Sequence, residues 1–301
     1  MPPRIRYLVV LVAVAGVLPL FFADLDAWQR VFAPEVQVFG HIFFFAALAW
    51  LVLQLPILQR FSFVVQAMIA LVSALVFGSL IELIQPYFGR SASMRDVWQN
   101  MLGAAVAVAW HAPRGTTRRL VTAAIGVVLA LEIFTPVTSL WDRGVARAQF
   151  PVLSDFSTPL EHRRWWRGER DTTISRHGPA SLRVDLKPGR VSGTAMLRSL
   201  GDWSRHDTLE ISIYNPADPM GITISVRDEE HMKRGRSYSD RFNRQFLLQP
   251  GWNEITIPTA DIRDAPAERQ QNLRDLVELA IVTTNLEEER TLYIDQVRLR
   301  E

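Results

Sequence analysis

The chain has 301 residues, 49% of them hydrophobic, with 33 basic and 31 acidic side chains. It contains no cysteine, which excludes disulfides, thiolate nucleophiles and cysteine-based zinc sites. Residues 1–149 carry 11 Arg against 7 Asp plus Glu, without the dense basic stripe of a nucleic-acid binder, so no nucleic-acid partner is expected. Apolar residues are concentrated in this first half, so the two halves are expected to form different classes of structure.

Five apolar segments in the first half approach the length needed to cross a bilayer. We expect them at about residues 5–23, 38–55, 61–84, 97–111 and 120–141. A cleavable signal peptide is the alternative for the first segment. No small-residue cleavage site closes that segment, however, because Pro19, Phe21 and Phe22 stand where one is needed. The sequence therefore predicts a membrane all-α helical bundle of about five transmembrane helices.

Arginines in the short loops predict the orientation of this bundle. When the spans alternate, one side of the membrane receives Arg4, Arg6, Arg60, Arg114, Arg118 and Arg119, and the other receives Arg30, Arg90 and Arg95. Positive residues favour the cytoplasmic side, so we expect a cytoplasmic N-terminus in a bacterial cytoplasmic membrane. Five spans then place the second half of the chain in the periplasm or outside the cell.

Six polar side chains lie at the outer ends of these expected helices. They are His41, Glu82, Gln85, Arg90, Asp96 and Asn100. Charged groups within membrane helices are costly and usually have a partner or a function. Taken singly, each fits a polar contact between helices. Together they predict a pocket for a phosphate- or sugar-bearing lipid headgroup, in which Arg90 pairs with an anionic oxygen and His41 and Glu82 exchange protons. The residues leave open whether the pocket binds or catalyses.

The motifs "HIFFFAALAW" and "IELIQPYFGRSASMRDVWQNMLGAAV" carry these polar residues. They resemble the VanZ-like membrane proteins, in which a His-headed span precedes a span ending in Glu-x-x-Gln, a Gly-Arg loop and a span opening with Asp-x-x-x-Asn. The resemblance implies a multi-pass envelope protein, in some relatives linked to tolerance of glycopeptide antibiotics. It assigns residues 1–112 to a VanZ-like domain and leaves 113–149 as a fifth transmembrane helix and linker. Glu132, in that fifth helix, has no explanation in the sequence.

Residues 150–301 contain short runs in which apolar and polar residues alternate, such as "SLRVDL", "TLEISIY" and "TLYIDQVRL". Alternation with turn residues between the runs predicts an all-β antiparallel jelly-roll or β-sandwich domain. One insert, residues 267–280, is predicted to be a short helix. Trp203 and Trp252 are expected in the core, because a Trp at the entrance to a strand is more often buried than exposed.

The stretches "VLSDF", "HGPASLRVDL", "YSDRFNRQFLLQPGWNEITIP" and "TLYIDQVRL" resemble carbohydrate-binding jelly-roll modules of the galactose-binding-like type. The resemblance implies a structural calcium ion held by Asp155 and Asp295. The alternative is that each aspartate bonds the backbone of its own turn. No other cofactor is expected.

Sugar binding requires exposed aromatic rings beside polar side chains. The candidates for this role are Trp165, Trp166, Tyr238, Asp240, Arg241 and Asn243. The alternative for the stretch Tyr238 to Asn243 is a place in the sandwich core.

Three functions are compatible with these features. The first is a multi-pass envelope protein that binds a lipid-linked or polysaccharide glycan at the outer face of the membrane, accessory to envelope glycan assembly or antibiotic tolerance, with membrane lipid and envelope glycan as partners. The second is a membrane enzyme acting on a phosphate- or sugar-bearing lipid headgroup through His41, Glu82, Arg90 and Asp96. The third is an interaction protein whose outer domain docks another envelope protein.

Overall fold

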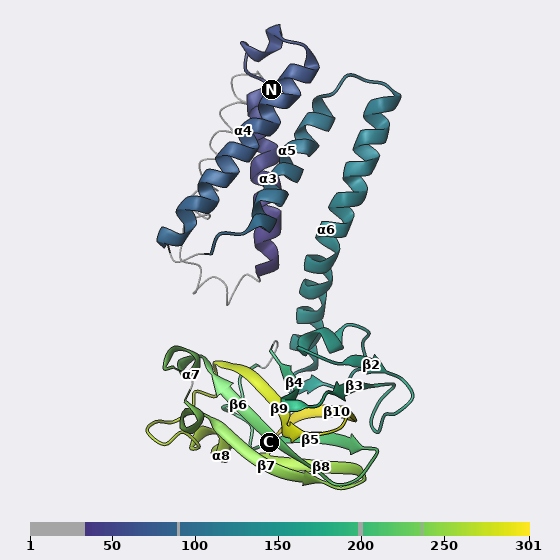
Figure 1. The fold of residues 1–301 in the computed structure, drawn as a ribbon, viewed down its shortest axis with the longest axis vertical. Coiled ribbons are helices and arrows are strands. Elements are labelled where there is room, and N and C mark those ends of the chain that lie inside the picture. The colour runs from purple at the N-terminus through teal and green to yellow at the C-terminus, as the bar shows by residue number, and fades with distance from the viewer. Residues whose placement is uncertain (1–33, 89–90, 198–200, 236) are drawn as a thin grey trace. The chain divides into compact units, whose positions relative to one another are not determined.

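A computed structural model of the chain describes residues 34–88, 91–197, 201–235 and 237–301 (Figure 1). The chain divides into two compact units, Met1–Leu140 and Trp141–Glu301, and each has its own hydrophobic core. The predicted first span, residues 5–23, lies outside the described residues, as does Arg90.

Four long helices build the described part of the first unit and lead into the second. They are α3 (Pro34–Leu53), α4 (Phe63–Ile84), α5 (Met94–His111) and α6 (Thr116–Gln149), with short 3-10 turns η2 (Leu58–Arg60) and η3 (Gln85–Phe88). The four segments predicted at residues 38–141 are therefore helical.

Small residues let these helices pack closely. A Cβ atom at Gly103 of α5 would lie 2.3 Å from the carbonyl oxygen of Ile42 in α3, and one at Gly78 of α4 would lie 2.7 Å from Nδ2 of Asn100. Alanines of α4 and α5 pack with Phe44 and Phe45 in the core of this unit. Such close approach of small residues is typical of helices packed within membranes.

Among the residues that the structure describes, two helices are long and apolar enough to cross a membrane by length and composition: the α4–η3 segment Phe63–Phe88 and α6. A shorter apolar helical segment is Val38–Leu53. Within the described residues, 28% of the most apolar 18-residue stretch of Phe63–Phe88 is buried. For the corresponding stretch of α6 the buried share is 6%.

The second unit is an antiparallel β-sandwich, which confirms the predicted fold of the second half. Its strands are β1 (Val152–Ser154), β2 (Glu169–Asp171), β3 (Ser181–Leu186), β4 (Gly189–Met196), β5 (Thr208–Asn215), β6 (Met220–Asp228), β7 (Phe242–Leu248), β8 (Gly251–Pro258), β9 (Leu276–Leu286) and β10 (Arg290–Arg300). Sheet A has the order β2-β3-β10-β5-β8 with β1 paired to β10, and sheet B has the order β4-β9-β6-β7.

Alternating residues of both sheets point inward and form the core. Ile211 and Ile213 of sheet A and Ile224 and Ile281 of sheet B are examples. Trp203 is fully buried in this core, as predicted.

Short helices and turns complete the sandwich. They are η4 (Glu161–Arg164), α7 (Glu229–Lys233), η5 (Tyr238–Asp240) and α8 (Thr259–Arg263). The helix predicted over residues 267–280 is wrong, because this segment is a loop that runs into strand β9. Its apolar residues Leu276 and Leu279 are buried beside β6, and strand pairing there replaces the helical pattern.

The last turns of α6 belong to the second unit, so this unit begins before the predicted boundary at residue 150. The Arg164 side chain is buried and forms two hydrogen bonds from Nε and Nη2 to the Asp142 carboxylate, at 2.9 and 2.8 Å. Its Nη1 donates to the Leu153 carbonyl oxygen at 2.8 Å. Glu161, also buried, accepts the backbone N–H groups of Phe156 and Thr158.

Candidate functional sites

The outward face of sheet B has small residues at its centre. Strand register places Asn243, Ser225, Ala280 and Ala195 in one row across β7, β6, β9 and β4. Their strand neighbours Phe242, Val226, Leu279 and Met196 lie in the core, so this row points outward. Ser225, Ala280 and Ala195 are nevertheless buried, which indicates that longer surrounding side chains rise above them. We call these outward-facing residues the sheet B face.

Trp166 lies at the β4 edge of the sheet B face. Its backbone N–H donates to the Ala195 carbonyl oxygen at 2.7 Å. Trp165 pairs with Met196 and is buried beside it in the core, so the next side chain points the opposite way. The Trp166 ring is accordingly 61% exposed, with the Arg167 guanidinium 4.1 Å from its centre. An exposed indole is therefore available at this edge.

Tyr238, Arg241 and Asn243 lie together at the opposite, β7 edge. The Tyr238 ring is 64% exposed, and the Arg241 guanidinium lies 5.3 Å from its centre. Arg241 Nε donates to Asn243 Oδ1 at 3.1 Å, and Asn243 Nδ2 donates to the Tyr238 carbonyl oxygen at 3.0 Å. These three predicted residues are thus brought together by the structure.

Positive charge predominates beside this group. Burial, and next the charge of Arg227, lowers the pKa of Arg241. Arg227 Nη1 in turn forms an ion pair with the Glu278 carboxylate at 3.0 Å. Two guanidinium groups and one carboxylate therefore lie at this end of the sheet B face, and the carboxylate is paired with Arg227.

A pocket of about 650 Å³ continues the same face toward the other end of sheet B. Outward residues of β6, β7 and β9 contribute Thr223, Gln245, Leu247 and Thr284 to its lining. Arg290 of β10 also lines it. The hydroxyl, amide and guanidinium groups of this pocket can hydrogen-bond to a polar ligand. The exposed Leu247 can contact the apolar faces of the same ligand.

One of the predicted sugar-binding residues is contradicted by the structure. Trp165 is only 5% exposed and packs beside Phe156 in the core, so it presents no ring to a sugar. The Asp240 carboxylate accepts hydrogen bonds from Nε and Nη2 of Arg269 at 2.6 and 3.1 Å. Asp240 is therefore already paired with a guanidinium, and its role in sugar binding stays a prediction.

Arg269 also binds Asp228, through two hydrogen bonds of 2.6 and 2.8 Å. The Asp228 pKa is lowered, because although burial raises it, hydrogen bonds from Arg269 and from the backbone of Asn272 and His231 outweigh burial. The Arg269 hydrogen bond is also the main cause of the lowered pKa of Asp240. The carboxylates of Asp228 and Asp240 thus share one partly buried guanidinium.

This arrangement predicts how the stability of the sandwich depends on pH. The folded-state pKa values of Asp228 and Asp240 both lie below the unfolded value. The stability that these carboxylates contribute is therefore fully present above about pH 4, and it is lost as pH falls through the folded-state values. Arg269→Met is therefore expected to destabilise the protein at pH 7 and much less near pH 2.5. The measurement is the urea midpoint of both proteins from pH 2.5 to 7. A difference that stays constant over this range contradicts the assignment.

An aromatic row on the outward face of sheet A was missed in the sequence. Tyr293, Tyr214 and Trp252 are in register across β10, β5 and β8, with ring centres 6.0 and 5.3 Å apart. Trp252 is half-buried there, so its predicted place in the core is wrong. The buried Ile255 and Ile257 of β8 point into the core. Side chains alternate along a strand, so Trp252, at an odd spacing from both, points to the opposite, outward face.

The aspartates predicted to hold calcium accept backbone hydrogen bonds. The fully buried Asp295 carboxylate accepts the N–H groups of Arg176, His177 and Gln296 at 2.7–2.9 Å. Asp155 Oδ1 accepts the Ser157 N–H at 3.0 Å. The Asp155 contact and the Gln296 contact match the turn-bonding alternative, whereas Arg176 and His177 belong to a segment distant from Asp295 in the sequence. Calcium binding stays a prediction.

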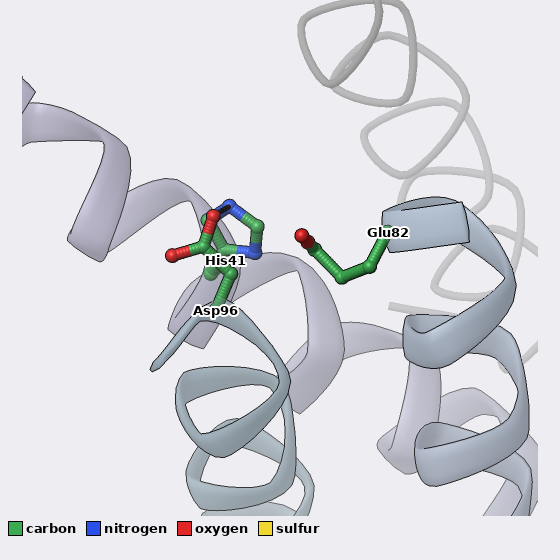
Figure 2. Close-up of side chains that lie close together, drawn as sticks. All are labelled: His41, Glu82 and Asp96. Atoms are coloured by element: carbon green, nitrogen blue, oxygen red, sulfur yellow. Dashed lines mark ion pairs between the residues drawn. The ribbon is translucent and has the colours of Figure 1, made fainter. Parts of the chain in front are cut away.

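The predicted polar pocket of the helical unit brings side chains from three helices together (Figure 2). His41 of α3 lies between residues of α5: its Nδ1 is 2.8 Å from Asn100 Oδ1 and its Nε2 is 3.5 Å from Asp96 Oδ2. Glu82 of α4 extends toward them and accepts the Ser93 N–H at 2.8 Å. Gln85 is fully buried at the end of α4.

Glu132 has two partners in α5. Trp98 Nε1 donates to its Oε1 at 3.1 Å, and Arg95 Nη2 lies 3.5 Å from its Oε2. These contacts tie α6 to α5 and account for a carboxylate in an apolar helix.

Comparisons with known proteins concern the sandwich alone. No protein-family model matches the chain, and no curated protein matches it. A family 11 carbohydrate-binding module from Clostridium thermocellum, in complex with a β-1,3-1,4-mixed-linked tetrasaccharide, is 15% identical, with a TM-score of 0.38; the match covers 50% of this chain and 94% of that chain. A family 30 module from the same organism is 17% identical over 44% of this chain and 82% of that chain, with a TM-score of 0.34.

An exo-β-agarase is 14% identical, with a TM-score of 0.39, and the match covers 50% of this chain and 24% of the agarase.

Proposed function

We propose that this chain is a multi-pass protein of the bacterial cytoplasmic membrane whose sandwich binds an envelope glycan along the sheet B face. The observation that carries the proposal is the placement of Trp166 and Tyr238 at opposite edges of a row of small residues. Pyranose rings present apolar C–H faces that stack on such aromatic rings. Small residues between the edges allow a polysaccharide to lie close to the sheet.

The dimensions and polar groups of the sheet B face fit such a ligand. Strands β4 and β7 are three strand spacings apart, or about 14 Å, which accommodates a single glycan chain. Asn243 and Gln245 offer amides that can donate to and accept from sugar hydroxyls. The guanidinium groups of Arg227 and Arg241 favour a glycan that carries carboxylate or phosphate groups.

The helical unit supplies the membrane attachment in this proposal. The largely exposed apolar surfaces of α4 and α6 favour contact with lipid, and the VanZ-like motif and loop arginines favour a cytoplasmic N-terminus. The sandwich then faces the periplasm or cell exterior, where envelope glycans are assembled. An accessory role in glycan assembly or antibiotic tolerance follows from binding there.

Removing either exposed ring is expected to weaken glycan binding about tenfold or more, because each loses a stacking surface at the edge of the site. The variants are Trp166→Ala and Tyr238→Ala in the full chain, purified in detergent. Affinity is measured on an array of bacterial envelope polysaccharides, followed by titration of the best ligand.

Trp252→Ala on sheet A is the comparison variant for this experiment. It removes a ring from the opposite face of the sandwich, so glycan affinity is expected to remain unchanged. If Trp252→Ala loses glycan binding while Trp166→Ala and Tyr238→Ala keep it, the site lies on sheet A. No binding to any polysaccharide by the wild-type chain would reject the proposal.

The second candidate function is an enzyme acting on a phosphate- or sugar-bearing lipid headgroup. It is favoured by the convergence of His41, Glu82 and Asp96 from three helices, with Arg90 in the adjoining loop of the sequence. His41→Ala and Glu82→Gln then abolish turnover of lipid-linked substrates while the protein still accumulates. If both variants fail to accumulate, these residues serve the fold.

A further inference from the structure

One group of side chains in the helical unit has the donor atoms of a metal site. Among the residues that the structure describes, His41, Glu82 and Asp96 form a set in which one ligand atom from each lies within 4.8 Å of the others. The three come from α3, α4 and α5, so the set exists only in the folded unit (Figure 2). His41 and Glu82 are buried and Asp96 is partly buried.

Asn100 orients the imidazole as a metal ligand requires. Its amide oxygen lies 2.8 Å from Nδ1 of His41, and an amide oxygen only accepts, so Nδ1 carries the hydrogen. The lone pair of a neutral His41 is then on Nε2, the nitrogen that faces Asp96. Metal-binding histidines typically donate their second ring N–H to an oxygen in this way.

The two carboxylates are placed on the Nε2 side of the ring. The distance of 3.5 Å from Nε2 to Asp96 Oδ2 is close to the separation of about 3.4 Å between two ligands of a tetrahedral zinc ion. The Ser93 N–H holds Glu82 Oε2 at 2.8 Å, which keeps the Glu82 carboxylate beside the N-terminus of α5. A Glu82 carboxylate oxygen lies within 4.8 Å of the ligand atoms of His41 and Asp96 and supplies the third ligand position.

The charge of these side chains is compatible with a divalent ion. Two carboxylates and a neutral imidazole carry a formal charge of −2, which one divalent cation balances.

We propose that His41, Glu82 and Asp96 bind a divalent transition-metal ion. One imidazole and two carboxylates suit Zn²⁺ or Mn²⁺, and three protein ligands leave a coordination position for water or a bound group. The site stands independently of glycan binding by the sandwich. It adds to the candidate headgroup enzyme a cation able to bind a phosphate oxygen.

The test uses the full chain in detergent, stripped with a chelator and titrated with Zn²⁺. We expect one ion per chain by calorimetry and elemental analysis. His41→Ala, Glu82→Gln and Asp96→Asn are each expected to lower the affinity more than about 100-fold, and Asn100→Ala by about 10- to 100-fold through the lost orientation of the imidazole. His111→Ala, which removes a histidine at the other end of α5, leaves the affinity unchanged.

Helical content by circular dichroism shows which variants remain folded. A second readout requires no variant: Co²⁺ bound to the wild-type chain is expected to show visible absorption bands of nitrogen–oxygen coordination, which stoichiometric Zn²⁺ removes. Failure of the folded wild-type chain to bind either ion stoichiometrically overturns the proposal. Unchanged Zn²⁺ affinity in a folded His41→Ala variant also overturns it. Glycan binding by the same preparation is measured in parallel, so the two proposals fail separately.

Discussion

Arg164→Met is expected to lower the free energy of unfolding of the sandwich by about 3–5 kcal/mol, the usual cost of removing one partner from a buried ion pair. Arg164 is 1% exposed, and its guanidinium binds Asp142 of α6 and the carbonyl oxygen of Leu153. Methionine fills much of the same volume but donates no hydrogen bond. The Asp142 carboxylate is then left buried without its cation.

Glu161 makes the same variant sensitive to acid. Burial raises the pKa of Glu161, but the Thr158 backbone hydrogen bond, the Arg164 charge and further hydrogen bonds outweigh burial and lower it. A lowered folded-state pKa stabilises the fold above the unfolded pKa, and this contribution is lost as pH falls through the folded value. Without Arg164 the folded pKa rises, so the acid-induced loss of stability begins at a higher pH.

The measurement is urea unfolding of the full chain in detergent, followed by tryptophan fluorescence at several pH values. Arg234→Met is the matched control, because Arg234 and its partner Glu230 are both about half exposed and 2.8 Å apart. Surface ion pairs contribute little to stability, so this control is expected to unfold at the wild-type midpoint. Equal behaviour of the two variants would show that the junction between α6 and the sandwich does not depend on Arg164.

Gly103→Ala is expected to destabilise the helical unit by about 1–3 kcal/mol, the usual cost of overpacking a close contact. The new Cβ would lie 2.3 Å from the Ile42 carbonyl oxygen and 3.1 Å from the Ala46 nitrogen. Both are backbone atoms of α3, so a side-chain rotation cannot relieve the clash. Because Ile42 follows His41, separation of α3 from α5 also disturbs the polar cluster.

Gly126→Ala is the matched control for this variant. It makes the same substitution inside α6, where an added Cβ has no neighbour within 4 Å among the described residues. Alanine favours a helix by up to about 1 kcal/mol relative to glycine, so this variant is expected to be as stable as the wild type or more so. Thermal unfolding in detergent measures both. A destabilised Gly126→Ala beside an unaffected Gly103→Ala contradicts the packing of α3 on α5.

Sequence periodicity was sufficient for most elements of the fold. Long apolar runs predicted the four described helices, and alternation predicted the strands of the sandwich, because both patterns arise from local backbone geometry. The helix predicted over residues 267–280 shows the limit of this reasoning. Leu276 and Leu279 pack beside β6, a strand about 50 residues earlier in the chain, and no local pattern records that partner.

The polar cluster was predicted from motif spacing and expected orientation, and His41, Glu82, Asp96 and Asn100 do lie together. The sugar-binding candidates were less predictable. Trp165 and Trp166 are adjacent and chemically identical, and only the pairing of Trp165 with Met196 decides which ring is buried. Asp240 looked available in the sequence because its partner, Arg269, is 29 residues away.

The sequence by itself therefore determined the classes of structure, their order, the lengths of the long apolar segments and the types of polar residue at each site. Tertiary structure decided which side chains face outward and which charges are already paired. The physical reason is that helix and strand periodicity depend on neighbours within a few residues, whereas burial and ion pairing depend on groups that folding brings together from distant parts of the chain. The exposure of the Trp166 ring and the approach of the Glu82 and Asp96 carboxylates to His41 arise only at that level.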